Sequence, residues 1–347
     1  MGYAAPTCWS WGGQGERFLT VHHVITGGAG FIGSHLADAL VARGDRITIV
    51  DDLTTGSLMN IEHLLAEPRV EFVEATVTDA SVLDDALEGA DTCFHLASAV
   101  GVHLIVDHPL ASLQRNVAGM QNVVEASHRH STRLVLASTS EIYGKGGTKL
   151  LHEDSDRVLG APTRARWTYA NAKSYGEMLA YGYHAEYGAE NTVVRFFNTV
   201  GPRQTGMYGM VVPSFVRQAL RGEDITVFGD GTQSRCFTHV RDSIDALLRV
   251  AECDECLGRP FNVGNTTEVT IQELAEEIVR MTGSGSRIRH VPYAEAYGEG
   301  FEELGSRRPD TTALEQTTGW QASHTVEEAI DEIILHESAE AASPIAA

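Results

Sequence analysis

The sequence predicts an α/β fold: a doubly wound, mainly parallel sheet with a smaller, loop-rich α/β lobe beside it. Three observations predict this class. From residue 21 onward, short apolar runs alternate with longer segments of helical periodicity, which is the pattern of βαβ units. The short runs are mainly apolar, as in strands that helices cover on both faces. After Asn198, glycine and proline become frequent, which indicates a region rich in loops.

The apolar runs are the expected strands, and the periodic segments between them are the expected helices. We expect strands at 21–26, 46–50, 92–96, 133–138, 192–197 and 260–263. We expect helices at 34–43, 111–130, 169–187, 213–220, 240–252, 270–281 and 326–336. Gly44 and Gly188 directly follow two of these helices, and glycine is the residue that most often ends a helix.

These elements divide the chain into two units and two ends. We expect an N-terminal extension over 1–20, a first domain over 21–200 to which the chain returns at about 236–268, a second lobe built from 201–235 and 269–336, and a mobile tail over 337–347. The second lobe would then lie over the carboxyl edge of the sheet, where open α/β folds bind their ligands.

Charge and composition exclude several classes of protein. The 347 residues carry 26 basic and 47 acidic side chains, a net charge of −21, which repels nucleic acid and anionic membranes. No apolar run approaches the roughly 20 residues that cross a bilayer, and residues 1–20 lack the apolar core of a secretory signal. Five scattered cysteines form neither a disulfide framework nor a zinc-type spacing. We therefore expect a cytoplasmic protein with no metal, no membrane partner and no nucleic-acid partner.

A glycine motif lies between the first expected strand and its helix. Gly27 permits a tight turn, Gly30 lets the backbone approach a pyrophosphate, and Gly33 lets the helix and strand pack closely. The helix N-terminus that follows presents free N–H groups to an anion. The motif therefore predicts a dinucleotide-binding site.

Two acidic residues at the end of the second strand point to NAD. Asp51 follows Gly33 by 18 residues, and at this spacing a carboxylate can accept hydrogen bonds from the adenosine ribose. Asp51 and Asp52 would repel the 2′-phosphate of NADP, and no Arg or Lys lies between Asp51 and Asn60 to neutralise it. We therefore expect NAD rather than NADP.

Candidate catalytic groups gather after the strand at 133–138. Thr139, Ser140 and Glu141 lie at its carboxyl end, and Tyr169 follows Thr139 by 30 residues. Lys173 comes four residues after Tyr169, so the two share one helix face. A lysine ammonium beside a phenol lowers the pKa of the phenol from about 10 toward the working pH. The pair would then act as a general base for a sugar or alcohol hydroxyl.

With these motifs the sequence resembles the extended short-chain dehydrogenases/reductases, a family of NAD-dependent nucleotide-sugar epimerases, dehydratases and decarboxylases. The resemblance covers 21–336 and is carried by TGGAGFIGSHL from Thr26, VDDLTTGS from Val50, HLAS from His95, NVAGMQNV from Asn116, STSEIYG from Ser138, YANAK from Tyr169, RFFNTVGPRQ from Arg195 and RRPDTTALEQTTGW from Arg307. It implies a Rossmann domain that binds NAD and a substrate lobe that binds a UDP-sugar. It also implies a homodimer formed through two helices that begin near Ala111 and Tyr169.

The resemblance assigns roles to particular residues. Tyr169 matches the base, Lys173 its partner at the nicotinamide ribose, and Thr139 the residue that hydrogen-bonds the reacting 4-hydroxyl. Cofactor contacts are expected at Gly27, Gly30, Phe31, Ile32, Gly33, Asp51, Asp52, Val77, Leu96, Ala97, Tyr169 and Lys173. Substrate contacts are expected at Thr139, Arg195, Asn198, Phe228, Arg235 and Arg308; of these, Asn198 and the arginines 235 and 308 match positions at the diphosphate, and Phe228 a position at the uracil.

The reaction is less well determined than the family. Ser140 stands where a typical 4,6-dehydratase has Asp, which disfavours dehydration, whereas Glu141 suits a UDP-glucuronate decarboxylase equally well. The loops from Ala97 and Asn198 look more like 4-epimerases, in which Arg195 would clamp the C6 carboxylate and suppress decarboxylation. We therefore expect a 4-epimerase that converts UDP-glucuronic acid to UDP-galacturonic acid. A UDP-glucuronate decarboxylase forming a UDP-pentose, or a UDP-glucose 4-epimerase, is the alternative.

Overall fold

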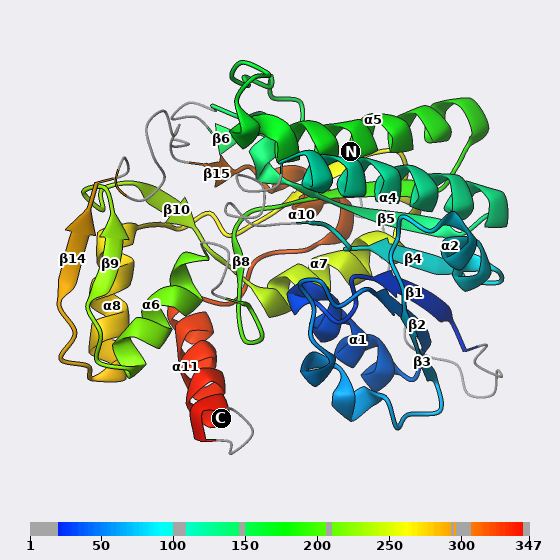
Figure 1. Ribbon diagram of the computed structural model, residues 1–347. Coiled ribbons are helices and arrows are strands. Elements are labelled where there is room, and N and C mark those ends of the chain that lie inside the picture. The colour runs from blue at the N-terminus through cyan, green and yellow to red at the C-terminus, as the bar shows by residue number, and fades with distance from the viewer. Residues whose placement is uncertain are drawn as a thin grey trace, which may run out of the picture.

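A seven-stranded parallel sheet forms the centre of the protein (Figure 1). The computed structural model describes residues 20–99, 109–145, 150–205, 210–292, 295 and 307–342. The strands lie in the order β12 (Pro260–Val263), β7 (Asn191–Phe196), β5 (Arg133–Thr139), β4 (Thr92–His95), β1 (His22–Thr26), β2 (Arg46–Asp51) and β3 (Val70–Glu74). The order reverses between β4 and β1, so the sheet is doubly wound, as the sequence predicts. Ligands of such sheets bind at the carboxyl ends beside this reversal.

Burial of the strands explains which of them the sequence reveals. β1 and β4 are buried from end to end, and each has a pair of adjacent apolar residues at its centre or toward its end, Val24 and Ile25 in β1 and Cys93 and Phe94 in β4. β3 lies at the edge of the sheet and alternates between exposed and half-buried residues. Glu71 and Glu74 therefore interrupt its apolar positions, and no apolar run predicts it.

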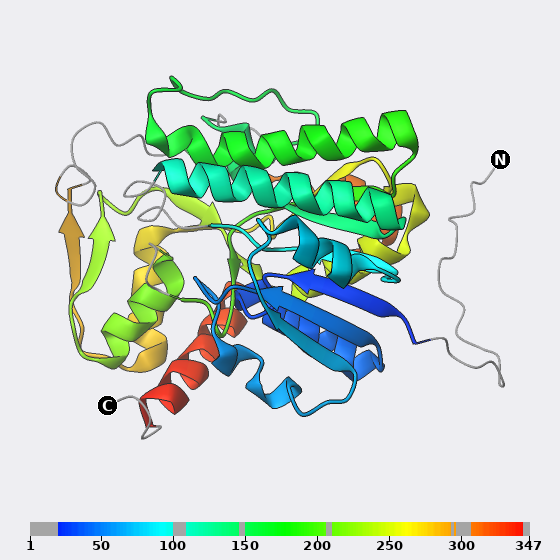
Figure 2. The same cartoon turned by 45° about the vertical axis from the view of Figure 1, so that its right-hand side comes forward.

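Helices cover both faces of the sheet (Figure 2). One face carries α2 (Ala80–Leu87), α4 (Pro109–His130) and α5 (Thr168–Tyr187), and the other carries α1 (Phe31–Arg43), α7 (Val240–Glu252) and α10 (Thr312–Thr318). α4 and α5 lie side by side on the first face. Gly44 and Gly188 end α1 and α5 in the left-handed conformation, with φ of 93° and 70°, which confirms them as the residues that end these helices.

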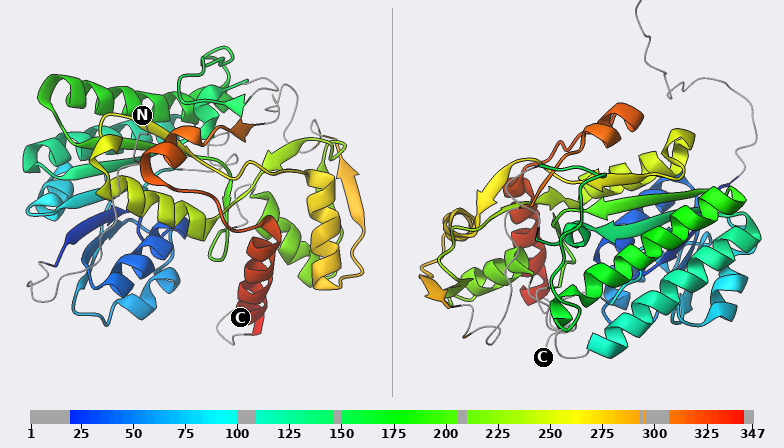
Figure 3. Two further views of the ribbon diagram at one scale, coloured as in Figure 1. Left: turned by 180° about the vertical axis from the view of Figure 1, so that it is seen from behind. Right: turned by 90° about the horizontal axis from the view of Figure 1, so that it is seen from above.

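A second lobe stands beside the carboxyl edge of the sheet (Figure 3). Its helices are α6 (Val211–Leu220), α8 (Ile271–Thr282) and α11 (Val326–Ala342), and it adds the parallel pair β9 (Ile225–Phe228) and β14 (Ile288–Val291). The apolar faces of the three helices share one hydrophobic core with β9.

Short strand pairs link this lobe to the sheet: β8 (Thr199–Val200) with β11 (Thr238–His239), β10 (Ser234–Cys236) with β13 (Glu268–Thr270), and β6 (Leu150–Leu151) with β15 (Arg308–Pro309). The described residues also form single 3₁₀ turns: η1 (Leu58–Asn60), η2 (Glu62–Leu64), η3 (Ser140–Tyr143), η4 (Ala165–Trp167) and η5 (Asp254–Cys256).

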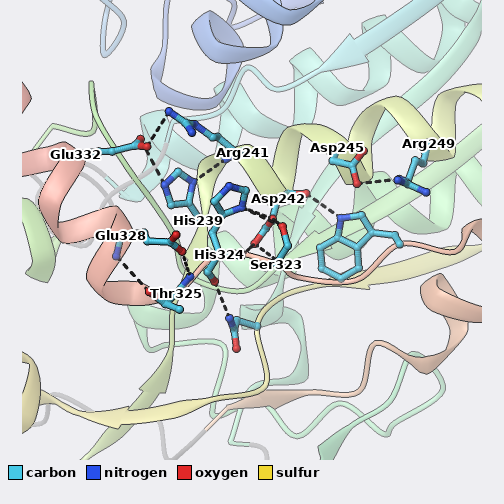
Figure 4. Close-up of polar contacts among 12 residues, drawn as sticks. His239, Arg241, Asp242, Asp245, Arg249, Ser323, His324, Thr325, Glu328 and Glu332 are labelled. Atoms are coloured by element: carbon cyan, nitrogen blue, oxygen red, sulfur yellow. Dashed lines mark hydrogen bonds and ion pairs between the residues drawn. The ribbon is translucent and has the colours of Figure 1, made fainter.

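A polar cluster ties α7 to the start of α11 (Figure 4). The buried carboxylate of Asp242 accepts a hydrogen bond from Ser323 Oγ at 2.9 Å and lies 2.7 Å from His324 Nδ1. The His324 ring packs on that of His239, with centroids 4.6 Å apart. On α7, Arg241 pairs with Glu332 of α11 at 2.7 Å. The cluster therefore fixes the second lobe against the helix layer of the sheet.

The structure corrects the expectation of a mobile tail from residue 337. α11 continues without a break to Ala342. Glu337 is largely buried, and its carboxylate accepts hydrogen bonds from Arg217 Nε and Nη2 at 2.7 and 2.8 Å. Residues 343–347, and residues 1–19 of the expected N-terminal extension, lie outside the described residues.

Candidate active site

A cavity of about 380 Å³ opens at the carboxyl ends of the central strands, beside the reversal of strand order. Its lining includes the residues expected at the cofactor: Gly27, Gly30, Phe31, Ile32, Gly33, Asp51, Asp52, Val77, Leu96, Ala97, Tyr169 and Lys173. It also includes Thr139, Ser140, Glu141 and Asn198. The structure thus brings the glycine motif, the acidic residues after β2 and the candidate catalytic groups into one cavity.

The glycine motif has the geometry of a cradle for a diphosphate. Gly27 has a φ of 74°, and a Cβ added there would lie 2.7 Å from the backbone nitrogen of Ala97. A Cβ on Gly33 would lie 2.2 Å from the Gly27 oxygen, so only glycine lets α1 pack this close to the turn. Gly30 begins α1 without a side-chain cap, and the first turn of α1 carries no acidic residue. The helix N-terminus is therefore suited to an anion.

Asp51 ties the cradle to the next strand. Its carboxylate accepts the N–H of Ala29 at 3.0 Å and the N–H of Leu53 at 2.9 Å. Burial raises the pKa of Asp51, and the backbone N–H groups oppose that rise. Each carboxylate oxygen can accept a second hydrogen bond, so Asp51 can still hold a ribose hydroxyl. These residues fit NAD.

The candidate catalytic residues meet at the end of β5. The Oγ of Thr139 accepts the N–H of Glu141 at 3.2 Å, which caps the η3 turn and fixes the three polar residues after the strand. Tyr169 and Lys173 are both buried, one turn apart on α5. Lys173 Nζ donates to the carbonyl oxygen of Ala137 at 2.9 Å and lies 5.9 Å from the centroid of the Tyr169 ring.

The ionisation of this pair differs from the expectation. Burial raises the pKa of Tyr169, and the carboxylate of Glu141 raises it further. Burial lowers the pKa of Lys173 to about 7, although Glu177 opposes the shift. The proximity of Lys173 is therefore not enough to lower the pKa of Tyr169, because desolvation of the phenolate is the larger effect. A further positive charge beside the phenol is needed to favour the phenolate.

Glu141 is held as an ionised carboxylate. Arg166 approaches it with two donors, Nη1 at 2.6 Å and Nη2 at 3.2 Å. Burial raises the pKa of Glu141, but Arg166 and Arg307 together outweigh this effect, so the net shift is downward. Arg166 precedes Tyr169 by three residues, and the ion pair therefore connects the turn after β5 with the start of α5.

The structure corrects the expectation for Arg195, which does not line the cavity. Arg195 is buried, and its Nε and Nη2 donate to Glu177, the latter at 2.6 Å. Its Nη1 donates to Tyr143 Oη at 2.9 Å and to the Glu153 carbonyl oxygen at 2.7 Å. With these three donor nitrogens engaged by the protein, Arg195 is not placed to clamp a substrate carboxylate. It is a structural ion-pair residue beneath the sheet edge.

The other expected substrate contacts lie around the cavity. Asn198, on its wall, has a φ of 40° and donates from Nδ2 to the Cys236 carbonyl oxygen at 2.9 Å. Arg235 is close enough to Glu141 to contribute to the lowering of its pKa. Phe228 ends β9 in the second lobe, and Arg308 begins β15 with an exposed side chain; neither lines the described cavity.

Two arginines in the cavity are absent from the sequence-based predictions. Arg307 is buried and donates from Nη1 to Ser140 Oγ at 3.2 Å. The resemblance points to its neighbour Arg308, but successive side chains of an extended segment point in opposite directions, and Arg307 is the one that faces the cavity. Arg115 of α4 lines the other end, beside Asp52. Only its tertiary position reveals it, because it lies 63 residues away in the sequence.

Within the described part of the chain, no helix combines the length and apolar character that crossing a bilayer requires.

Comparisons with known proteins agree with this geometry. The model of the "NAD dependent epimerase/dehydratase family" matches residues 23–264. Over 312 residues the chain is 40% identical to the UDP-N-acetyl-alpha-D-glucosaminuronate decarboxylase of Bacillus cytotoxicus, covering 90% of this chain and 96% of that protein. Over 324 residues it is 33% identical to UDP-glucuronic acid decarboxylase 1 of Arabidopsis thaliana, covering 93% and 70%. Among solved structures, UDP-glucose 4-epimerase of Thermotoga maritima with UDP-glucose superposes with a TM-score of 0.83 at 26% identity, covering 92% of this chain and all of that one.

Proposed function

Because the chain belongs to the NAD dependent epimerase/dehydratase family, we propose that it uses NAD to oxidise a UDP-linked uronic acid at C4 and then removes the C5 carboxylate as carbon dioxide. The product is a UDP-linked sugar of the pentose type. The sequence-based expectation placed 4-epimerisation first and this decarboxylation second. The relatives reverse that order, since those of 40% and 33% identity are both named as decarboxylases.

The contact of Arg307 with Ser140 in the cavity carries the proposal. These groups and Glu141 place a guanidinium, a hydroxyl and a carboxylate together beside Tyr169, where a sugar would react. A second observation removes the main argument for epimerisation. Arg195, which would have held the substrate carboxylate in the plane of the ketone, is engaged with Glu177 instead.

Oxidation at C4 uses the residues at the ends of β5 and α5. The Thr139 hydroxyl orients the 4-hydroxyl of the sugar, and the Tyr169 phenolate takes its proton as the C4 hydride departs. Bound NAD supplies the hydride acceptor and the positive charge of its nicotinamide. The buried Lys173 ammonium holds the base in place from the same helix face.

Loss of the carboxylate then follows from the chemistry of the ketone. The C6 carboxylate is β to the C4 carbonyl, so cleavage of the C5–C6 bond releases carbon dioxide and leaves the electron pair in an enolate over C4 and C5. In this proposal Arg307 stabilises this negative charge, and the Ser140 hydroxyl, whose oxygen accepts a hydrogen bond from Arg307, donates to the enolate oxygen. Glu141 is ionised and paired with Arg166, so it helps to fix the residues after β5. As a carboxylate it does not donate the proton that C5 receives. A solvent proton would complete C5, and Tyr169 would return its proton to the 4-oxygen as the C4 carbonyl takes back the hydride held on the reduced cofactor.

The substrate is proposed from the same relatives. Because the relative of 40% identity is named for the N-acetylated uronate and that of 33% identity for UDP-glucuronic acid, a UDP-linked uronic acid is the shared class. We propose that Asn198, Arg235 and Arg308 hold its diphosphate and that Phe228 packs on the uracil. We further propose a homodimer through α4 and α5, on which Leu110 and Met178 are exposed.

Product analysis tests the reaction. The purified chain is incubated separately with UDP-glucuronic acid, UDP-N-acetylglucosaminuronic acid and UDP-glucose, and products are followed by NMR while carbon dioxide is trapped. We expect carbon dioxide and a UDP-linked pentose-type sugar from at least one uronate, and no product from UDP-glucose. A 4-epimer that retains its carboxylate would show instead that the chain is an epimerase. Turnover of UDP-glucose alone would remove uronates from the proposal.

A further inference from the structure

An arginine side chain lies at the end of the cavity expected to hold the adenosine ribose, although the sequence directly after Asp51 and Asp52 contains no basic residue. Arg115 of α4 lines the cavity together with Asp52 and Thr54, which follow β2. Its Nη1 donates to Thr54 Oγ1 at 3.0 Å and lies 3.4 Å from Asp52 Oδ2. No Arg or Lys lies between residues 51 and 60, but a distant part of the chain supplies a basic side chain to this end of the cavity.

The two acidic residues at this end are in different environments. Asp51 is buried and accepts two backbone N–H groups, so its carboxylate is part of the cradle. Leu53, with a φ of 57°, turns the chain after them. The Asp52 side chain is 28% exposed, accepts the N–H of Thr54 at 3.0 Å and faces Arg115. Asp52 is thus the exchangeable partner of the guanidinium, whereas Asp51 is fixed.

Arg115 is separated from the reacting end of the cavity. Among the described residues of its lining, the other lysine and arginine side chains are Lys173 and Arg307, which contact residues at the end of β5. Between β2 and β5 lie β1 and β4, so the two ends are three strand spacings apart, roughly 14 Å at about 4.8 Å each. A phosphate on the adenosine ribose would meet Arg115 and neither of the other two.

We propose that Arg115 is a selectivity residue for the cofactor and that it acts through Asp52. In the native chain Asp52 neutralises Arg115, so the guanidinium is withheld from a 2′-phosphate and NADP is rejected. Without the Asp52 charge, the same guanidinium can form charge-assisted hydrogen bonds with the phosphate oxygens. Loss of the Asp52 carboxylate, without any added basic residue, would therefore strengthen NADP binding even though Asp51 remains in the cavity.

Binding measurements on four full-length proteins test this inference: the native chain, Asp52→Asn, Arg115→Met and the double variant. Nucleotide carried through purification is identified and counted first, and dissociation constants for NAD and NADP are then measured by equilibrium dialysis. We expect Asp52→Asn to bind NADP at least about tenfold more tightly than the native chain, equivalent to about 1.4 kcal/mol, with a change of less than about threefold for NAD. In the double variant the gain for NADP is lost.

A matched ion pair on the same helix serves as the control. Asp84 pairs with Arg129 of α4 and does not line the cavity, so Asp84→Asn should change neither dissociation constant. Equal affinity for NADP in Asp52→Asn and the double variant would overturn the role of Arg115. No gain in Asp52→Asn, at an unchanged melting temperature, would overturn the role of Asp52. If the Asn variant folds poorly, Asp52→Ser removes the same charge. The readout is binding alone, so either outcome is separable from the identity of the reaction.

Discussion

Arg195 Nη2 lies 2.6 Å from Glu177 Oε2, and this ion pair is the centre of a buried polar network beneath the active site. Glu177 also accepts a hydrogen bond from Ser138, the residue before Thr139. Arg195 donates to Tyr143, whose hydroxyl donates to Asn262 at 2.7 Å. The network therefore joins β5, α5, β7 and β12 directly under the residues that line the cavity.

Arg195→Met should destabilise the protein without changing its choice of substrate. The substitution leaves the buried Glu177 carboxylate without its main partner, and breaking such a pair costs about 3–5 kcal/mol. In the double variant Arg195→Met/Glu177→Leu, most of this loss should be recovered because no uncompensated charge remains. Urea unfolding measures both. A loss of activity confined to uronates, with native stability, would return Arg195 to the role of carboxylate clamp.

Arg307 and Arg308 should have separable effects on catalysis. Arg307→Met removes the guanidinium beside Ser140, and we expect kcat for a uronate to fall by about 10²-fold or more, as when an oxyanion donor is lost. Arg308→Met should instead raise KM, if Arg308 holds the diphosphate. Steady-state kinetics with a UDP-uronate, and competition by UDP alone, distinguish them. A KM effect of Arg307→Met with unchanged kcat would contradict its role in the reaction.

Lys173→Met should abolish turnover and stabilise the fold at neutral and acidic pH. Burial lowers the pKa of Lys173 from 10.5 to about 7 in the folded chain, so below pH 7 the folded state bears the full cost of a buried charge. This cost declines as pH rises from about 7 to 10.5, where only the unfolded chain holds the proton. The melting temperature of the variant should therefore exceed that of the native chain by roughly 2 °C or more at pH 6, and the difference should vanish near pH 10.5. A difference that does not depend on pH would show that Lys173 is not desolvated as described.

Arg166→Met should shift the acid side of the pH–rate profile upward. Burial raises the pKa of Glu141, and without Arg166 less positive charge remains to oppose it. If catalysis needs Glu141 ionised, activity should then be lost at a higher pH than in the native chain. Arg164→Met, an exposed arginine two residues earlier, is the control and should leave the profile unchanged. An identical profile in both variants would mean that the charge of Glu141 is not required.

How far the sequence predicts this site depends on whether the information is local. The glycine cradle is set by local sequence, because Gly27, Gly30 and Gly33 all lie within one turn and the start of one helix. The Thr139 turn and the Tyr169–Lys173 spacing are local in the same sense. Each expected cofactor contact therefore lines the cavity, and the doubly wound sheet is confirmed.

The features that the sequence analysis missed or misjudged depend on how distant segments pack. The sequence motif around Arg195 predicted a substrate contact, but in the fold its guanidinium is paired with Glu177 of α5. Arg307 lines the cavity and Arg308 does not, and which of the two neighbours does so depends on how the extended segment that includes β15 is oriented. Arg115 enters from α4, and no spacing in the sequence relates it to Asp52. The ionisation of Tyr169 likewise follows from burial, which composition does not report.

The composition of the second hydrophobic core has a consequence during synthesis on the ribosome. This core joins Val212 of α6 and Leu274 of α8 to Ile330 and Ile333 of α11. Domains form from the N-terminus while translation proceeds at about 5–20 residues per second. The sheet strands are complete once β12 has emerged, but the second core must wait for residue 333. For that interval the apolar surface of α6 and α8 that α11 covers stays exposed, and a ribosome that stalls before α11 would leave a nascent chain prone to aggregate.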